Sequence, residues 1–279
     1  MPVAGEPLIR RIATWLAAGG VTELVVNLHH RPDTLTAVLG DGNDLGVRVR
    51  YSWEQPRVLG SAGGPRLALP LLAVDTFLLV NGDTLTDLDV AALVDAHVRE
   101  QALVTLALVP NVEFERYGGV RVDGDGRVTG FARRGDASKG TGHFIGVQVV
   151  NASVFEPLAA GEPASTVGGL YDRLIAERPG SVRAQYSNAA FWDVGTASDY
   201  LRTSHAFGAG RAHVGRNARI DRSADIDGSV LWDDVQVGAD ASVQECIVAD
   251  GVDVPAGARY RRSILMRGHD SLVVTPIDN

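Results

Sequence analysis

The carboxylate of Asp83 stands at a point in the chain where ligand-binding groups of α/β proteins are common. It ends the stretch LLVNGD (78–83), in which an apolar strand runs directly into Asn-Gly-Asp. Ligands bind at the carboxyl ends of strands in such sheets, and glycine lets the backbone approach them closely. Mg²⁺ prefers carboxylate and phosphate oxygens, so Asp83 is a candidate Mg²⁺ ligand. A helix cap or an Asx turn is the alternative, and Asp87 is predicted to cap the following helix.

Asp193 has the same character. It lies in FWDVG (191–195), between two large apolar residues and before a glycine turn that leads into a helix. A carboxylate with such neighbours is costly to bury unless a partner compensates its charge. A second metal-binding carboxylate explains this position, and a cap to the glycine turn is the alternative. Two carboxylates at strand ends in one domain strengthen the metal hypothesis beyond either alone.

A glycine-rich turn, LGSAGG (59–64), leads into a helix that prolines break. The N–H groups of such a turn can bind a base or a phosphate. The chain contains no P-loop and no dinucleotide-binding fingerprint.

Other polar stretches do not form a site. DGDGR (123–127) suggests a calcium loop, but Arg134 stands where the twelfth loop position requires Glu, so a hairpin turn is predicted. The seven histidines have no metal-ligand spacing, and no Ser/His/Asp arrangement can be defended.

Composition excludes several classes of protein. The net charge of −8 and the lack of a Lys/Arg cluster argue against nucleic-acid binding. The single Cys246 excludes an internal disulfide and a thiolate metal cluster. No apolar run is long enough to span a bilayer, and the first 20 residues do not resemble a signal peptide. These features predict a cytoplasmic protein that does not bind membranes.

Alternating strand and helix patterns predict an α/β domain over residues 1–207. Strands separated by helices of ten to fifteen residues favour a Rossmann-like, mostly parallel sheet. The expected helices cover 6–18, 33–39, 65–72, 87–101, 165–177 and 197–207. The expected strands cover 22–28, 47–53, 75–83, 103–109, 143–155 and 182–187, with a hairpin over 118–132.

Residues 208–279 lack helical periodicity and contain repeats instead. Segments 230–246 and 247–263 align without gaps, so that Val230, Ile247 and Ile264 lie 17 residues apart. Upstream, apolar residues recur every six positions, which is the signature of a hexapeptide β-helix. The few coils suggest a cap or an oligomerisation module, and Trp232 and Tyr260 are expected to point outward.

Taken in order, these stretches resemble the sugar-phosphate nucleotidyltransferases that carry a short left-handed β-helix behind the catalytic domain. The branch includes mannose-1-phosphate guanylyltransferases and glucose-1-phosphate nucleotidyltransferases. The resemblance covers nearly the whole chain, through PVAGEPLIRRIATWLAAGGVTELVVNLHH, LGSAGG, NGD, YGGVRVDGDGRVTGF, HFIGVQVV and WDVGTASDYL. It implies that a nucleoside triphosphate is joined to a sugar 1-phosphate, with release of pyrophosphate, and that a homo-oligomer can form through the β-helix.

The resemblance also implies roles for individual residues. Asp83 and Asp193 would hold Mg²⁺, and Arg134 would supply charge to the sugar phosphate where many relatives carry Lys. Arg133 stands where they carry Glu, and His143 lies in a segment that often reads Asn-x-Gly. The residues expected at the nucleobase are Gly60, Ser61, Ala62, Gly63 and Gly64, and those expected at the sugar are Gly119, Arg133, His143 and Gly146.

The chain departs most from the family at its start. Relatives begin with a strand and a glycine-rich loop, roughly GxGxRLxPLT, that wraps the triphosphate, and neither precedes PVAGEPL here. The resemblance thus implies a sheet lacking one central strand, with two unpaired edges. Two interpretations follow: an enzyme whose start is truncated, as a misassigned start codon would cause, or a non-catalytic relative that binds nucleotide sugars or regulates a partner. Transfer of an acyl group by the β-helix is disfavoured, because coils 230–264 contain no histidine.

Overall fold

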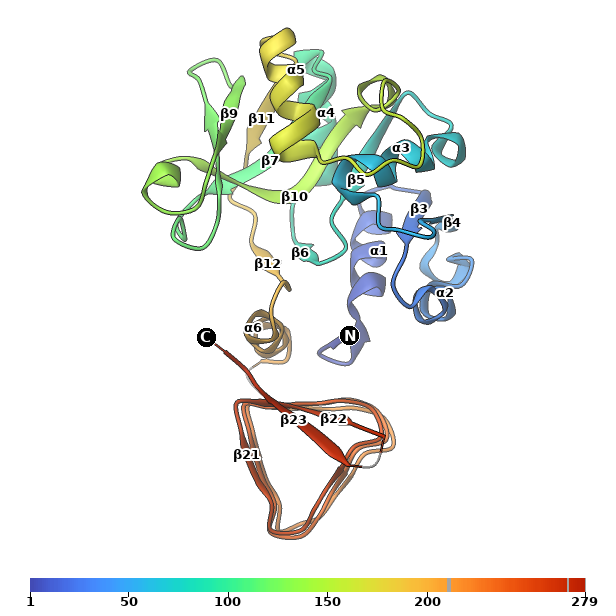
Figure 1. The fold of residues 1–279 in the computed structure, drawn as a ribbon, viewed down its shortest axis with the longest axis vertical. Coiled ribbons are helices and arrows are strands. Elements are labelled where there is room, and N and C mark those ends of the chain that lie inside the picture. The colour runs from blue at the N-terminus through green and yellow to red at the C-terminus, as the bar shows by residue number, and fades with distance from the viewer. Residues whose placement is uncertain (210–211, 270, 279) are drawn as a thin grey trace. The chain divides into compact units, whose positions relative to one another are not determined.

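The computed structural model describes residues 1–209, 212–269 and 271–278, shown as a ribbon in Figure 1. The chain forms two compact units. The larger comprises residues 12–191, and the smaller combines residues 1–11 with residues 192–279. No helix within the described ranges is both long and apolar enough to cross a membrane.

The main sheet of the larger unit is mixed. Its strand order is β11-β7-β10-β8-β9, and β5 pairs with β10. β7 and β11 are parallel, whereas β10 runs antiparallel to β5, β7 and β8. The strands are β5 (Thr76–Val80), β7 (Val104–Pro110), β8 (Gly119–Val122), β9 (Val128–Ala132), β10 (Gly142–Asn151) and β11 (Val182–Tyr186).

The mixed sheet corrects the expectation of a mostly parallel one, while the α/β class is confirmed. A parallel neighbour needs a crossover of a dozen or more residues, usually a helix. β10 follows the antiparallel hairpin β8–β9 with only a short loop and a 3₁₀ turn at Asp136–Ser138 between them. β9 and β10 lie on either side of β8 and both run antiparallel to it, so the short connection joins two strands of the same direction that are not neighbours.

A separate two-stranded parallel sheet pairs β3 (Glu23–Leu28) with β4 (Arg48–Trp53) through a crossover that contains α2 (Pro32–Leu39). β3 pairs only with β4, and β5 only with β10, so within the described residues each strand has one edge without a neighbour. The apolar residues 77–80 of β5 are only half-buried, whereas residues 104–109 of β7 are buried throughout.

Helices pack on these sheets and complete two apolar clusters. One cluster centres on Leu106, Phe155 and Tyr171, and the other on Leu93, Ile145 and Val147.

Asp89 caps α4 by accepting the N–H of Ala92, so the predicted cap at Asp87 is wrong. Asp87 instead accepts the N–H of Ala190 at 2.8 Å. The helices are α1 (Leu8–Ala18), α3 (Gly60–Leu72), α4 (Val90–Glu100) and α5 (Tyr171–Glu177), while α6 (Ala197–Phe207) belongs to the smaller unit.

The C-terminal repeats form three stacked coils with a triangular outline (Figure 1). Val230 pairs with Ile247, and Ile247 pairs with Ile264, which confirms the 17-residue register. The left-handed β-helix is consistent with the many short parallel strands. These are β13 (His213–Val214), β14 (Arg219–Ile220), β15 (Asp225–Asp227), β16 (Val230–Leu231), β17 (Gln236–Val237), β18 (Ser242–Gln244), β19 (Ile247–Val248), β20 (Asp253–Val254) and β21 (Arg259–Arg261). The remaining strands are β22 (Ser263–Arg267) and β23 (Leu272–Pro276), which form an antiparallel hairpin, and the short β1 (Pro2–Val3), β2 (Glu6–Pro7), β6 (Thr84–Thr86) and β12 (Phe191–Asp193).

The corners of the coils share a backbone conformation. Asn217, Asp234 and Gly251 lie 17 residues apart, and all three have positive φ values of 57°, 59° and 65°. Only residues that tolerate the left-handed region suit such a corner, and Asn, Asp and Gly do so best. The residues with positive φ and the inward-facing apolar residues therefore repeat with the same period of 17.

Two aromatic residues that were expected to point outward do not mark an exposed surface. Tyr260 packs against the β-helix core. The indole N–H of Trp232 donates to the hydroxyl of Tyr200 on α6 at 3.0 Å, and Tyr200 in turn donates to the carbonyl of Pro2. The side chains of Trp232 and Tyr260 thus both make contacts within the smaller unit.

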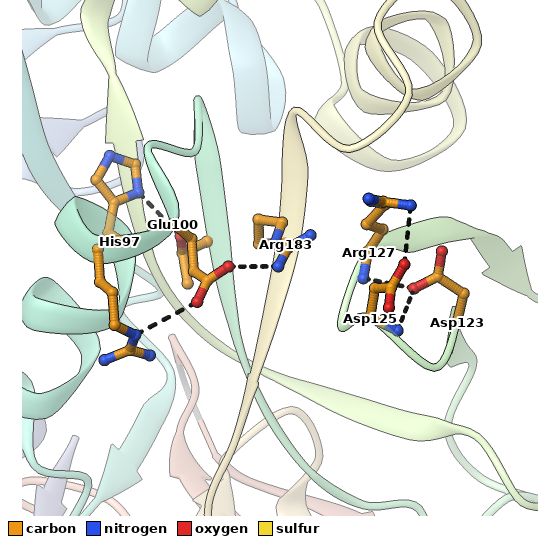
Figure 2. A network of polar contacts seen from close by, with 8 residues as sticks. His97, Glu100, Asp123, Asp125, Arg127 and Arg183 are labelled. Carbon is orange, nitrogen blue, oxygen red and sulfur yellow. Dashed lines mark hydrogen bonds and ion pairs between the residues drawn. The ribbon is translucent and has the colours of Figure 1, made fainter.

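The tip of the β8–β9 hairpin covers the outer edge of β11. Gly126 accepts the N–H of Ala184 at 3.0 Å. Asp123 accepts the N–H groups of Asp125 and Arg127, each at 2.9 Å, which confirms a turn at DGDGR (Figure 2). On the same strand, the Arg183 guanidinium donates to Glu100 at the end of α4. The hairpin thus shields an edge that could otherwise pair with another chain.

The DGDGR turn and the Arg183–Glu100 pair are both expected to be acid-sensitive. The Arg127 N–H holds the pKa of Asp123 below its ordinary value of 3.8, and the Arg183 guanidinium holds the pKa of Glu100 below 4.5. A lowered carboxyl pKa gives stability that is present above the unfolded-state pKa and is lost as pH falls through the folded-state pKa. Carboxyl ¹³C NMR titration should place both midpoints below these values, and Arg183→Met should return that of Glu100 toward 4.5. Midpoints at or above the ordinary values would contradict the assignment.

Candidate functional site

Asp83 lies on an exposed turn between β5 and β6. The turn is held against β10, because the N–H of Asn81 donates to the carbonyl of Gly146 at 2.8 Å. Gly146 has φ +76°, and a Cβ placed there would lie 2.8 to 2.9 Å from the Asn81 side chain. Gly146 therefore accepts both the backbone conformation and the close approach of the turn that carries Asp83. Asp83 does not cap a helix, since Asp89 caps α4.

A β-bulge accompanies this contact. The pairing of β10 with β7 shifts register between Phe144 and Gln148, a stretch that contains Gly146. Bulges redirect side chains and recur beside functional sites. The bulge here separates His143, near the start of β10, from the part of the strand that pairs with β5.

Asp193 ends β12 in the smaller unit and is half-buried. Both of its carboxylate oxygens lie 3.4 Å from the Cβ position of Gly195. Helix α6 has its own capping box, in which Thr196 accepts the Asp199 N–H and Asp199 accepts the Thr196 N–H, each at 3.1 Å. The helix that follows Asp193 thus needs no cap from it.

Asp83 and Asp193, the two predicted metal ligands, belong to different units. In the described part of the chain, no three His, Cys, Asp or Glu side chains gather in a way that could hold a metal ion. Mg²⁺ does not require such a cage, because proteins usually bind it through one or two carboxylates together with substrate phosphates and water. Asp83 and Asp193 supply carboxylates of that kind.

The glycine-rich turn is built as a rigid surface at the start of α3. The N–H groups of Ala62 and Gly63 donate to the carbonyl of Ala164, at 2.9 and 3.3 Å. Ser61 accepts the N–H of Thr166 at 2.9 Å. A Cβ at Gly60 or Gly63 would lie 2.8 Å from Ala164 O or 2.5 Å from Glu162 O, so both glycines permit close packing.

Glu54 supports this turn and was not among the residues expected to act. It is only 7% exposed and follows β4 directly. One carboxylate oxygen accepts the Leu59 N–H at 2.7 Å, and the other accepts the Asn27 amide at 2.9 Å. A Cβ at Gly64 would lie 2.4 Å from Glu54 Oε1. Only burial reveals this role, because an acidic residue beside a proline turn is expected to be exposed.

The residues predicted at the sugar lie around the neighbouring ends of β8, β9 and β10. Gly119 pairs with Ala132, the residue before Arg133, and Gly142, the residue before His143, pairs with Val120. A Cβ at Gly119 would lie 1.9 Å from Thr141 Oγ1, so glycine is required there for packing. Arg133 and Arg134 are exposed beyond β9.

An aromatic cluster that the sequence did not reveal lies beside these residues. The Tyr117 ring is 4.2 Å from that of His143, and His143 is 4.8 Å from Phe191. The Arg116 guanidinium lies 4.6 Å from the centre of the Tyr117 ring. Buried Asn111 fixes the backbone here, because its amide donates to the carbonyls of Tyr117 and Gly118 at 3.4 and 3.3 Å. In the sequence, the only sign of this cluster was the position of Tyr117 directly before two glycines.

The structure thus gathers part of the expected site. Within the larger unit, β10 contains His143 and Gly146. Gly146 contacts the turn that carries Asp83, and Gly142, next to His143, pairs with Val120, next to Gly119. The turn from Gly60 to Gly64 contacts residues 162–166 and Glu54 in the same unit, while Asp193 belongs to the smaller one.

The nucleotidyl transferase family matches residues 1–209 of the chain. The chain belongs to this family. Residues 209–261 match the GlmU-like C-terminal hexapeptide family. The resemblance inferred from the ordered motifs and the hexapeptide repeat is therefore confirmed. Enzymes of this family generally use a divalent metal ion.

Named relatives act on sugar 1-phosphates. The chain is 28% identical to the mannose-1-phosphate guanylyltransferase of Mycobacterium tuberculosis, over 94% of this chain and 76% of that one. It is 34% identical to the N-acetylmuramate alpha-1-phosphate uridylyltransferase of Neisseria meningitidis, over 70% and 83%. The crystal structure of HddC from Yersinia pseudotuberculosis has the same fold, with a TM-score of 0.65 at 22% identity, covering 74% of this chain and 88% of that one.

Glu54→Gln is expected to destabilise the larger unit by about 1–3 kcal/mol. The amide would present a donor to either the Leu59 N–H or the Asn27 amide, leaving a buried polar group unsatisfied. Urea unfolding of the purified protein measures the loss. Glu23→Gln removes a carboxylate whose partner, Arg50, forms an exposed pair, and it should cost much less. Equal costs for the two variants would contradict the role of Glu54.

Proposed function

We propose that this chain joins a nucleoside triphosphate to a sugar 1-phosphate, forming a nucleoside diphosphate sugar and pyrophosphate. The observation that carries the proposal is the Asp83 turn held against Gly146 on β10, in a chain of the nucleotidyl transferase family. The names of the relatives support sugar 1-phosphates as the acceptor class.

In the proposed reaction, a phosphate oxygen of the sugar 1-phosphate attacks the α-phosphorus of the triphosphate in line. A new P–O bond forms as the bond to the β-phosphate oxygen breaks, and pyrophosphate leaves with that electron pair. Such transfers need little covalent chemistry from the protein, which positions the reactants and offsets their negative charge. The chain's own net charge of −8 makes local cationic groups important for that second task.

Asp83 and Asp193 are each proposed as ligands of Mg²⁺. When bound, Mg²⁺ would neutralise phosphate charge and polarise the phosphorus that is attacked. The carboxylates would fix where that charge lies, and the capping arrangements of α4 and α6 leave neither of them required as a helix cap.

The other expected residues divide between base and sugar. The turn formed by Gly60, Ser61, Ala62, Gly63 and Gly64 would contact the nucleobase through its exposed residues Gly60 and Ser61, while the other three are buried and would support them. Gly119, Gly146 and His143 would contact the sugar, with His143 oriented by Tyr117. Arg134 is proposed to contact the sugar phosphate, and Arg133 lies beside it on the same exposed segment.

Two further expectations also stay predictions. A cytoplasmic location is favoured by the composition, in which one buried cysteine can form no internal disulfide. Self-association through the β-helix is expected from the family resemblance.

The proposed activity is tested with a substrate panel that crosses GTP, UTP, ATP and dTTP with several hexose 1-phosphates in the presence of Mg²⁺. At least one pair should release pyrophosphate in equal amount to the nucleoside diphosphate sugar formed, measured by a coupled phosphate assay and by chromatography. Calorimetric binding of nucleoside diphosphate sugars without any turnover would instead support a non-catalytic binding protein. If the chain shows no turnover and also binds no nucleoside diphosphate sugar, the proposal is contradicted.

Asp83→Asn and Asp193→Asn should each lower metal-dependent pyrophosphate release by about 100-fold or more, because a catalytic metal ion stabilises transition-state charge by several kcal/mol. Asp89→Asn is the matched control, since Asn also caps helices well and α4 should be preserved. Initial rates across Mg²⁺ concentrations provide the measurement. If either variant keeps the full rate, the substituted residue does not have the role assigned to it.

A further inference from the structure

Two loops of the larger unit meet beside the residues expected at the sugar. One loop, residues 111–118, joins β7 to β8, and the other, residues 133–141, joins β9 to β10. The N–H of Gly135 in the second loop donates to the carbonyl of Phe114 in the first at 2.7 Å. The two loops therefore hold each other, although their only regular element is one 3₁₀ turn.

Ser138 lies at the buried centre of this contact. It is 0% exposed. Its hydroxyl has a single hydrogen, and three carbonyl oxygens lie within its reach, those of Gly135 at 2.9 Å, Phe114 at 3.0 Å and Tyr117 at 3.1 Å. Two of these carbonyls belong to the other loop. Ser138 therefore supplies a donor to both loops at a position that water does not reach.

Asn111 approaches one of the same carbonyls. Its buried side-chain amide donates to the carbonyls of Tyr117 and Gly118. A carbonyl oxygen has two lone pairs, so that of Tyr117 can accept from Ser138 and Asn111 at once. Two buried side chains from different loops thus hold the peptide bond between Tyr117 and Gly118.

The held carbonyl determines where the other side of this peptide points. The peptide is trans, and the C=O and N–H of a planar trans peptide point in opposite directions. Because the Tyr117 carbonyl is directed at Ser138 and Asn111, the Gly118 N–H is directed away from them. Gly118 is exposed and precedes Gly119, one of the residues expected at the sugar. A donor fixed in this way needs no reorganisation to meet a substrate oxygen.

Stacking of the Tyr117 ring does not replace these bonds. The ring contacts His143 and Arg116, which fixes the position of the side chain. The backbone that follows consists of two glycines, and glycine restricts its own φ and ψ angles least. The peptide between Tyr117 and Gly118 is therefore free to rotate unless its carbonyl is held.

We propose that Ser138 and Asn111 are positioning residues for the sugar 1-phosphate, which act through the Gly118 N–H. The inference rests on the proposed function, because it concerns the acceptor of that reaction. The two side chains act before the sugar binds, by holding the donor in its bound orientation. Without them, binding would have to order the peptide, which lowers the affinity for this substrate and not for the nucleoside triphosphate.

The peptide can be observed by itself, because Tyr117–Gly118 is the single Tyr-Gly pair in the chain. The full chain labelled with ¹³C-carbonyl tyrosine and ¹⁵N-glycine should give one carbonyl-correlated amide resonance. This resonance should shift in the native chain when a hexose 1-phosphate is added. The probe is the compound that the substrate panel selects, or mannose 1-phosphate if the panel selects none. Ser138→Ala and Asn111→Ala should each shift the resonance in the ligand-free chain.

Steady-state kinetics separates positioning from stability. In Ser138→Ala and Asn111→Ala, the KM for the sugar 1-phosphate should rise by about threefold to tenfold, as the loss of one hydrogen bond predicts. The KM for the nucleoside triphosphate should change by less than about twofold.

Ser229→Ala is the matched control. Ser229 is also fully buried, and its hydroxyl donates to the carbonyls of Asp227 and Val243 in the β-helix, at 2.9 and 3.0 Å. Its loss should lower the Tm about as much as Ser138→Ala does and leave both KM values unchanged. If Ser138→Ala fails to fold, Asn111→Ala tests the same peptide.

The outcomes distinguish this inference from the proposed function. In a chain that turns over, an unchanged KM for the sugar 1-phosphate in both variants overturns the positioning role and leaves the function intact. Equal increases in both KM values, or the same increase in Ser229→Ala, overturn it as well. If the native chain has no turnover, the proposed function fails, and the resonance decides the inference. A shift with the hexose 1-phosphate then supports it, and no shift overturns it.

Discussion

The pairing of β10 on both of its edges positions most of the candidate site. Its second half bonds to β5 on one side and to β7 on the other, while its first residue reaches β8. Between its two halves the register of β10 against β7 shifts, in the stretch from Phe144 to Gln148 that contains Gly146. Gly146 lies within this bulge and accepts the close approach of Asn81, so the bulge lies where β10 contacts the turn that carries Asp83.

Support for the glycine-rich turn at the start of α3 is of a different kind. Glu54 is a buried carboxylate whose charge is balanced by an N–H and an amide rather than by a cation. Removing a donor from such a group is costly, which makes the conformation of the turn strongly specified. The packing of Gly60 and Gly63 against residues 162–164 adds a second constraint on the conformation of the turn.

Much of the fold follows from local sequence signals. Most elements of the larger unit and the 17-residue coil register follow from apolar periodicity and turn residues, but β6 was not predicted, and residues 152–154 form a 3₁₀ turn in place of the expected strand. The antiparallel course of β10 was missed because pairing direction depends on which strands meet, and no local pattern encodes that. Strand-end carboxylates such as Asp83 are visible from sequence, whereas Glu54 and the Tyr117 ring acquire their roles from residues distant in the chain.

The corners of the β-helix have a consequence for how this protein can vary. Asn217, Asp234 and Gly251 hold the bends, and a separate set of inward residues fills the core. Exposed strand residues such as Asp225 and Arg259 belong to neither set. The coil is therefore a scaffold whose geometry and whose surface chemistry are under separate control. Charged residues on an outer face can therefore be substituted one at a time during evolution without disturbing the fold.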